Sequence, residues 1–262
     1  MYMLDFHHHT NHSFDSKAVM EDVCKNAITK GIKEICFTEH FSLNFQSPTN
    51  GHINLTNYFS DIKSCQEKFQ DQLLIRKGLE ICEPHLLKDL YCKTFEPLEL
   101  DFILGSVHNI NNRTLRETLE KKQLAGYKDY FQEVYEMVSI ADIDVVAHLD
   151  LMKRYAYEEF GLYDFTEYRE ILEAILSKII ERNLGIEINT SGLRTSLNES
   201  LPSINIVKLY KELGGEILTV GSDSHSPDSV GSFIKEAIEM AKECGFTYVF
   251  SFDKRKAIPH KI

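Results

Sequence analysis

Short apolar runs alternate along this chain with longer stretches in which apolar residues recur every three or four positions. Short runs that end at polar or turn residues predict buried strands, whereas the longer periodic stretches predict amphipathic helices. The predicted strands cover residues 3–6, 35–40, 73–80, 101–108, 145–148, 186–189, 217–221 and 248–250. The predicted helices cover residues 19–30, 55–69, 127–140, 165–182, 204–213 and 231–244.

This alternation of strand and helix predicts parallel strands joined by helical crossovers. About seven such units favour a closed or nearly closed sheet, so we expect an α/β fold of the distorted (β/α)7 barrel type, similar to a TIM barrel. A doubly wound open sheet is the alternative, since no Gly-rich phosphate loop decides between the two. The 262 residues show no linker or repeat, which predicts a single domain over residues 1–262. Irregular structure is predicted for residues 81–101, with Pro84 and Pro97, for the stretch that opens at Asn109 and for residues 153–157.

Histidines stand at the ends of most of these predicted strands. Side chains alternate along a strand, so His7 and His9 point to one face and His8 points to the other. An affinity-tag remnant is a poor interpretation of this triplet, because it is short and runs out of an apolar strand. The histidines at strand ends are His7, His9, His40, His108, His148 and His225. The carboxylates in the same layer are Asp15, Glu80 and Asp223.

These nine side chains predict a metal site at the carboxyl-terminal ends of the strands, where barrels of this kind carry their active sites. A lone histidine at a strand end is usually structural, but six at equivalent places are difficult to explain in that way. Nine ligands are too many for one ion, and carboxylates bridge the cations of clusters with two or three metals. A mixed imidazole and carboxylate set suits zinc, iron or manganese, and it leaves the choice among them open.

The composition narrows the partners of such a site. The net charge is -11 and no run of Lys and Arg is present, so a nucleic-acid partner is disfavoured whereas a small phosphate ester is not. No apolar run approaches the roughly 20 residues of a membrane span, so we expect no membrane partner. The six cysteines form no C-x-x-C pair and no basic-then-apolar leader is present, which favours a reducing cytoplasm. The oligomeric state is left open.

The motifs around these residues resemble those of the polymerase and histidinol phosphatase (PHP) superfamily. They lie in the family order between residues 5 and 225 and so extend over most of the chain. Within that superfamily the chain is similar to the stand-alone histidinol-phosphate phosphatases of histidine biosynthesis. Three features favour this branch: the length of the chain and the stretches His148–Leu151 and Glu187–Arg194. The matching stretches are His7–Thr10, Thr38–His40, Gly78–Glu80, Gly105–His108, Ala147–Asp150 and Gly221–His225.

The resemblance implies a trinuclear metal site in a seven-unit barrel. In that assignment, one ion is held by His7, His9, Glu80 and Asp223. Glu80 bridges to a second ion, which His108 and His148 also hold. The third ion is held by Asp15, His40 and His225. The ligands at which the reaction takes place are expected to be Asp15, His40, Glu80, Asp223 and His225.

The activity that the resemblance implies is metal-dependent hydrolysis of L-histidinol phosphate to L-histidinol and phosphate. We expect in-line attack by a metal-activated hydroxide without a phosphoenzyme intermediate, because cations neutralise the phosphoryl oxygens and lower the pKa of water. A phosphoesterase of the same superfamily that acts on nucleotides or nucleic-acid ends is the alternative. A non-catalytic metal-binding or regulatory module is disfavoured, because a structural zinc site needs only four ligands and usually includes cysteine.

Substrate contacts are predicted from charge and position. Arg154 and Arg194 are the candidates for the phosphate, because a guanidinium matches it in bidentate fashion, whereas Lys153 is better interpreted as a surface cation. The leaving alkoxide would take its proton from His12 or Asp150, and the sequence does not choose between them. The candidates to complement the ammonium and imidazole of the substrate are Glu83, Phe41, Tyr155 and Tyr157.

Overall fold

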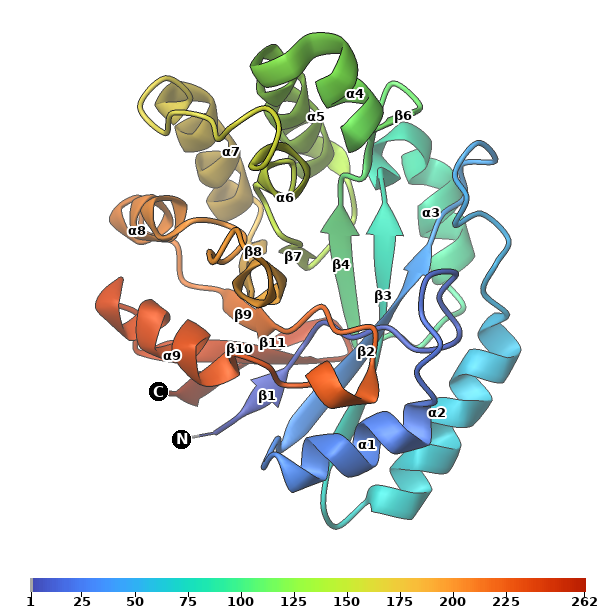
Figure 1. Cartoon of the computed structure of the whole chain (residues 1–262). Helices are drawn as coiled ribbons and strands as arrows, with labels where there is room; N and C mark the ends of the chain where they lie inside the picture. The colour runs from blue at the N-terminus through green and yellow to red at the C-terminus, as the bar shows by residue number, and fades with distance from the viewer. Residues whose placement is uncertain (1) are drawn as a thin grey trace.

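The computed structural model describes residues 2–262, and seven of its strands form one parallel sheet (Figure 1). The sheet closes because the Phe6 amide donates to the Val220 carbonyl at 2.9 Å and His8 forms a parallel bridge with Ser224. The predicted barrel is therefore confirmed, and the open doubly wound sheet is not observed. In sheet order the strands are β1 (Leu4–Asp5), β2 (Glu34–Phe41), β3 (Leu74–Cys82), β4 (Phe102–Ser106), β7 (Val145–Val146), β8 (Gly185–Asn189) and β9 (Leu218–Gly221).

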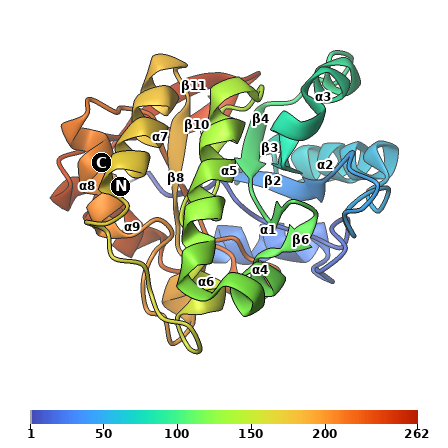
Figure 2. The same cartoon turned by 90° about the horizontal axis from the view of Figure 1, so that it is seen from above.

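Helices surround this sheet, as the view from above shows (Figure 2). They bury the apolar face that their periodicity predicts. In α5, for example, the aromatic side chains of Tyr127, Tyr130 and Phe131 are buried and form part of the core. The helices are α1 (Met20–Thr29), α2 (Leu55–Phe69), α3 (Lys88–Phe95), α4 (Leu115–Lys122), α5 (Gly126–Ile140), α6 (Lys153–Ala156), α7 (Arg169–Glu181), α8 (Ile204–Glu212) and α9 (Ile234–Glu243).

Three stretches predicted to be irregular contain helices or strands. Within residues 81–101, Pro84 opens a 3-10 turn (Pro84–Leu87) that leads directly into α3. Proline is tolerated at the first turn of a helix, so it begins this segment instead of breaking it. After Asn109, the short strands β5 (Asn109–Ile110) and β6 (Arg113–Thr114) form a hairpin, and Thr114 then caps α4 in a capping box. The stretch 153–157 contains the short helix α6.

The last strand predicted, at 248–250, belongs to a hairpin of β10 (Tyr248–Asp253) and β11 (Lys256–Lys261). This hairpin packs at the amino-terminal end of the barrel strands, where the Phe252 ring lies 4.9 Å from that of Phe102. Arg255 is anchored there as well, with its Nε atom 2.7 Å from Asp144 Oδ2. Arg255 is therefore held by an ion pair and is not part of a solvated tail. Among the helices of residues 2–262, none is long and apolar enough to cross a bilayer.

Candidate metal centre

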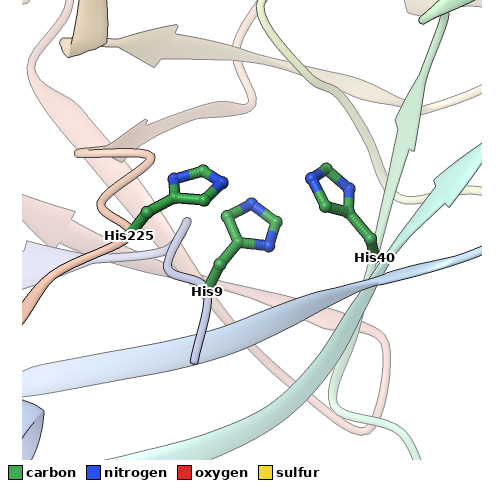
Figure 3. A group of neighbouring side chains, drawn as sticks. All are labelled: His9, His40 and His225. Atoms are coloured by element: carbon green, nitrogen blue, oxygen red, sulfur yellow. The ribbon is translucent and has the colours of Figure 1, made fainter. Parts of the chain in front are cut away.

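The structure brings all nine predicted ligands together at the carboxyl-terminal end of the barrel. Strand register explains part of this, because His40 in β2 and Glu80 in β3 are direct partners in the parallel ladder. His9 follows β1 and His225 follows β9, which meet where the barrel closes. The rings of His9 and His40 stack with centroids 4.2 Å apart, and those of His9 and His225 with centroids 4.4 Å apart (Figure 3). Residues more than 200 positions apart in the chain thus form one group.

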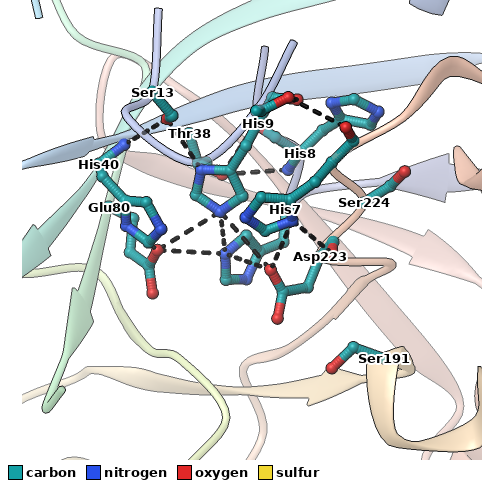
Figure 4. Close-up of polar contacts among 12 residues, drawn as sticks. His7, His8, His9, Ser13, Thr38, His40, Glu80, Ser191, Asp223 and Ser224 are labelled. Carbon is teal, nitrogen blue, oxygen red and sulfur yellow. Dashed lines mark hydrogen bonds and ion pairs between the residues drawn. The ribbon is translucent and has the colours of Figure 1, made fainter. Parts of the chain in front are cut away.

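The first part of this group contains donor atoms of His7, His9, Glu80 and Asp223 (Figure 4). The Nε2 atoms of His7 and His9 are 3.0 Å apart, and each lies 3.4 Å from Glu80 Oε2. The same nitrogens lie 3.7 and 3.6 Å from Asp223 Oδ1. Ligands about 2.1 Å from a tetrahedral ion are about 3.4 Å from one another. The two histidine nitrogens are therefore spaced from each other and from each carboxylate oxygen approximately as ligands of one divalent cation are.

Glu80 faces a second set of donors with its other oxygen. Its Oε1 atom lies 2.9 Å from His148 Nε2 and 3.5 Å from His108 Nε2. A carboxylate whose two oxygens face different imidazole groups has the arrangement of a bridging ligand. Glu80 has no exposed surface, and no Lys or Arg contact with it occurs among the ion pairs of residues 2–262.

A third set of donors lies at the exposed edge of the group. Asp15 Oδ2 lies 3.3 Å from His40 Nε2 and 3.2 Å from His225 Nε2. His40 also contacts Glu80, with 2.8 Å between Nδ1 and Oε2, so this set is continuous with the first. The donor atoms can be divided into the three sets that the resemblance implies, but they also form groups that cross those sets, such as His9, His40 and His225 or His7, His148 and Asp223. Their chemistry fits divalent ions.

The protonation states of the ligand candidates differ. Burial opposes protonation of His7 and His40, but the carboxylates beside them, Glu187 and Asp223 for His7 and Glu80 for His40, outweigh it and hold the pKa of both rings well above the usual value, so each would lose a proton on binding a metal. Burial lowers the pKa of His108 to about 3, and burial together with the neighbouring His40 holds the pKa of His9 well below its usual value. Both rings are therefore neutral at pH 7. Burial opposes ionisation of Glu80, but the imidazoles of His40 and His7 outweigh it and keep the pKa of this carboxyl low. Neutral imidazoles and ionised carboxylates are the forms in which these groups bind metals.

Glu187 is a site residue that sequence reasoning did not identify as such. Its Oε1 atom lies 2.8 Å from His7 Nδ1, and its Oε2 atom accepts the backbone N–H of His148 at 2.9 Å. A hydrogen bond at Nδ1 leaves Nε2 of His7 free to face the cluster. The available signal was the alternation Glu187, Asn189 within a buried strand, which points both side chains to the same face.

The backbone at the site is tightly constrained. Asp223 has φ +50° and His148 has φ +27°, a region that residues with a Cβ rarely adopt. Gly221 approaches its neighbours closely, since a Cβ atom there would lie 2.3 Å from Glu187 Oε1 and 2.4 Å from His7 Cβ. His8 points away from the cluster, as predicted, and packs edge-on against Phe37 with ring centroids 5.8 Å apart.

A cavity of about 370 Å³ opens over the cluster, and one of the two arginines predicted to bind phosphate lines it. Arg154 lines it, with Nη2 2.7 Å from Asp223 Oδ2 and in contact with the Ser191 hydroxyl. Arg194 does not line the cavity. It donates instead to the backbone carbonyls of Ser222 and Asp223, at 2.6 and 3.0 Å, and so braces the loop that carries Asp223.

The two proton-donor candidates and Lys153 are engaged elsewhere. His12 Nε2 lies 2.9 Å from Asp61 Oδ2. Asp150 is buried and forms an ion pair with Lys153 at 3.0 Å. Lys153 is itself 1% exposed, so its interpretation as a surface cation was wrong. None of these three side chains lines the cavity.

Of the four residues predicted to contact the ammonium and imidazole of the substrate, one lines the cavity and three do not. Tyr155 lines the cavity. Glu83 accepts the backbone N–H groups of His108 and Asn109, at 2.6 and 2.8 Å, and so holds the His108 segment in place. Phe41 packs on Phe95, with ring centroids 5.3 Å apart, and Tyr157 bonds Ser196. The cavity lining instead includes residues that sequence reasoning did not single out, among them Phe14, Cys82 and Arg116.

Comparison with known proteins identifies the family. The family model described as PHP domain matches residues 5–191, which is most of the chain and includes seven of the nine ligand candidates. The chain belongs to the PHP domain family. A PHP relative from Clostridium acetobutylicum, a probable histidinol-phosphatase, is 33% identical over 97% of this chain and 98% of its own.

Solved structures agree with this membership. Histidinol phosphate phosphatase from Lactococcus lactis, in complex with zinc, L-histidinol and phosphate, superimposes on this PHP chain with a TM-score of 0.90. The two are 29% identical, and the match covers 98% of each chain. A putative histidinol phosphatase from Listeria monocytogenes shares the fold, with a TM-score of 0.75 at 21% identity over 89% of this chain and 99% of the other.

Proposed function

We propose that this chain is a histidinol-phosphatase, a metal-dependent phosphomonoesterase that converts L-histidinol phosphate to L-histidinol and phosphate in histidine biosynthesis. The observation that carries the proposal is the arrangement of three donor sets beside the Arg154 guanidinium, at the base of one cavity. The full-length similarity to the Lactococcus lactis enzyme, solved with zinc, L-histidinol and phosphate, supports this substrate. The 370 Å³ cavity also lies within the range of small-molecule sites, about 300–1,000 Å³.

We further propose three divalent ions in the three donor sets, with zinc, manganese and iron as the candidates. The first would be held by His7, His9, Glu80 and Asp223, the second by Glu80, His108 and His148, and the third by Asp15, His40 and His225. When bound, such ions neutralise phosphoryl oxygens and lower the pKa of water, which supplies a nucleophile near neutral pH.

The chain's own residues orient the substrate. Arg154 is positioned to bind a phosphoryl oxygen, because its guanidinium lines the cavity beside Asp223 and retains further N–H donors. Arg194 acts indirectly, by holding the carbonyls of the Asp223 loop. The phosphoryl group passes to water directly. We also propose that residues 1–262 act as one domain and that the enzyme works in the reducing cytoplasm, where its six free cysteines would remain thiols.

The test is phosphate release by the metal-loaded enzyme from L-histidinol phosphate, beside a panel of nucleotides and sugar phosphates. We expect a strong preference for L-histidinol phosphate and loss of turnover with a chelator. Chelator-sensitive release that is faster from a nucleotide would support the alternative phosphoesterase and overturn the substrate assignment.

Arg154→Gln tests the phosphate contact in the same assay. We expect kcat/KM for L-histidinol phosphate to fall by about 100-fold or more, since a charge-matched donor to the transferring group is lost. Arg169→Gln, on the exposed face of α7, is the matched control and should leave kcat/KM unchanged.

A further inference from the structure

A thiol stands among the metal-ligand candidates and has no part in the proposed reaction. Cys82 follows Glu80 by two residues in β3, so both side chains point to the same side of the strand. Cys82 is 2% exposed and lines the cavity. Its Sγ atom lies 3.3 Å from His108 Nδ1, and its thiol also contacts His40. The thiol is therefore within the cluster instead of in the apolar core.

His108 presents its two ring nitrogens to two different groups. Nε2 faces Glu80 Oε1 at 3.5 Å, whereas Nδ1 faces Cys82. One possible ligand atom from each of His40, Cys82 and His108 lies within 4.8 Å of the other two. The His40 side chain is 9% exposed, and its Nδ1 atom lies 2.8 Å from Glu80 Oε2. These three side chains form a second ligand set that overlaps the main cluster.

We propose that His40, Cys82 and His108 form an inhibitory position for a thiophilic divalent ion such as Cd²⁺. Thiolate and imidazole donors select soft or borderline ions, whereas Mn²⁺ prefers oxygen ligands. On binding, the thiol proton passes to solvent and the sulfur forms a bond to the ion, with no change of oxidation state. A neutral imidazole can bind a metal through only one of its two ring nitrogens. An ion held by His108 Nδ1 therefore leaves Nε2 protonated and unable to bind an ion of the main cluster, so the two positions compete for this ring. The inference is independent of the organic substrate.

Cd²⁺ added to the full-length, manganese-loaded enzyme tests this position. Thiolate-to-cadmium charge transfer absorbs in the ultraviolet and reports the Cd–S bond without any substrate. We expect this absorption in the wild type and in Cys92→Ser, which alters an exposed cysteine. In Cys82→Ser we expect it to be lost, with an affinity for Cd²⁺ weaker by about tenfold or more. The rate of phosphate release is compared with the rate of the same protein without Cd²⁺. We expect it to fall as the absorption grows in the wild type and in Cys92→Ser, and to fall less in Cys82→Ser.

Two results would overturn the proposal. The first is the absence of the charge-transfer band in the wild type, and the second is its persistence in a folded Cys82→Ser variant, which would assign it to another thiol. If Cys82→Ser does not fold, protection of Cys82 in the wild type is measured with methyl methanethiosulfonate and peptide mass spectrometry. Cd²⁺ should then slow modification of Cys82, and an unchanged rate would equally exclude the position.

Discussion

Single residues set the donor geometry of the cluster, and the most informative of them are not ligands. Glu187 holds Nδ1 of His7, and Gly221 leaves room for both side chains. Histidines at strand ends could be identified from sequence because the pattern repeats. Glu187 could not, because a carboxylate inside a strand has a role only relative to a partner 180 positions away. Cys82 was missed for the same reason, since its partner His108 lies in another strand's loop.

Glu187→Gln is expected to weaken the site without unfolding the chain. The variant keeps the shape of the side chain but loses the charge that orients His7, so metal affinity or kcat should fall by about 10–100-fold. Metal content and kcat are measured together. Glu243→Gln, at the exposed end of α9, is the matched control. Wild-type metal content and kcat in Glu187→Gln would show that His7 needs no such partner.

Gly221→Ala tests the close approach beneath His7. The added Cβ atom would lie 2.3 Å from Glu187 Oε1 and 2.4 Å from His7 Cβ, so His7 must move. We expect a loss of about 1–3 kcal/mol in the free energy of unfolding together with a large loss of turnover. Gly214→Ala has φ +94° but nothing within 4 Å of the new Cβ, so it should cost stability and not activity. Equal turnover in both variants would refute the steric argument.

At the scale of elements, the ligand candidates lie at the ends of strands. The barrel strands were easier to predict than the segments that connect them. The apolar runs located each barrel strand, since burial on both faces leaves a clear signal. The α3 and α4 segments were missed because Pro84 was interpreted as a breaker and the residues after Asn109 as a polar loop, although they begin a 3-10 turn and a hairpin. The β10–β11 hairpin was also underestimated, because its anchor, Arg255, depends on distant Asp144.

Arg255→Gln is predicted to destabilise the fold in a pH-dependent way. Burial raises the pKa of Asp144 to about 6 while Arg255 opposes that rise, so removing Arg255 would raise this pKa further. Below the native pKa, Asp144 is protonated in both proteins and little is lost. Above it, the variant must bury an unpaired carboxylate, at a cost of about 2 kcal/mol. The loss should therefore grow as pH rises through about 6.

Urea unfolding of Arg255→Gln across this pH range measures the effect. Lys256→Gln, which alters an exposed neighbour in β11, is the control and should show no such trend. A stability loss in Arg255→Gln that is the same at about pH 5 and about pH 8 would contradict the assignment, because linkage requires it to follow the charge of Asp144.

At the scale of the whole molecule, barrel topology turns a dispersed set of residues into one site. The seven parallel strands occur in sequence order, and β1 meets β9, so ligand candidates from His7 to His225 converge. This convergence could be predicted because parallel strands place all their carboxyl ends at one mouth. Which arginine lines the cavity could not be predicted, because it depends on how the short helix α6, which carries Arg154, and the 3-10 turn Ser191–Arg194 direct their side chains.

Metal dependence is the most direct test of the central claim. Enzyme stripped by a chelator is titrated with Mn²⁺ or Zn²⁺, while bound ions and phosphate release from L-histidinol phosphate are measured on the same samples. We predict no turnover in the stripped enzyme, recovery as ions bind, and none in a His9→Ala variant that keeps its fold. Full turnover without bound ions, or in folded His9→Ala, would contradict a catalytic metal cluster at this site.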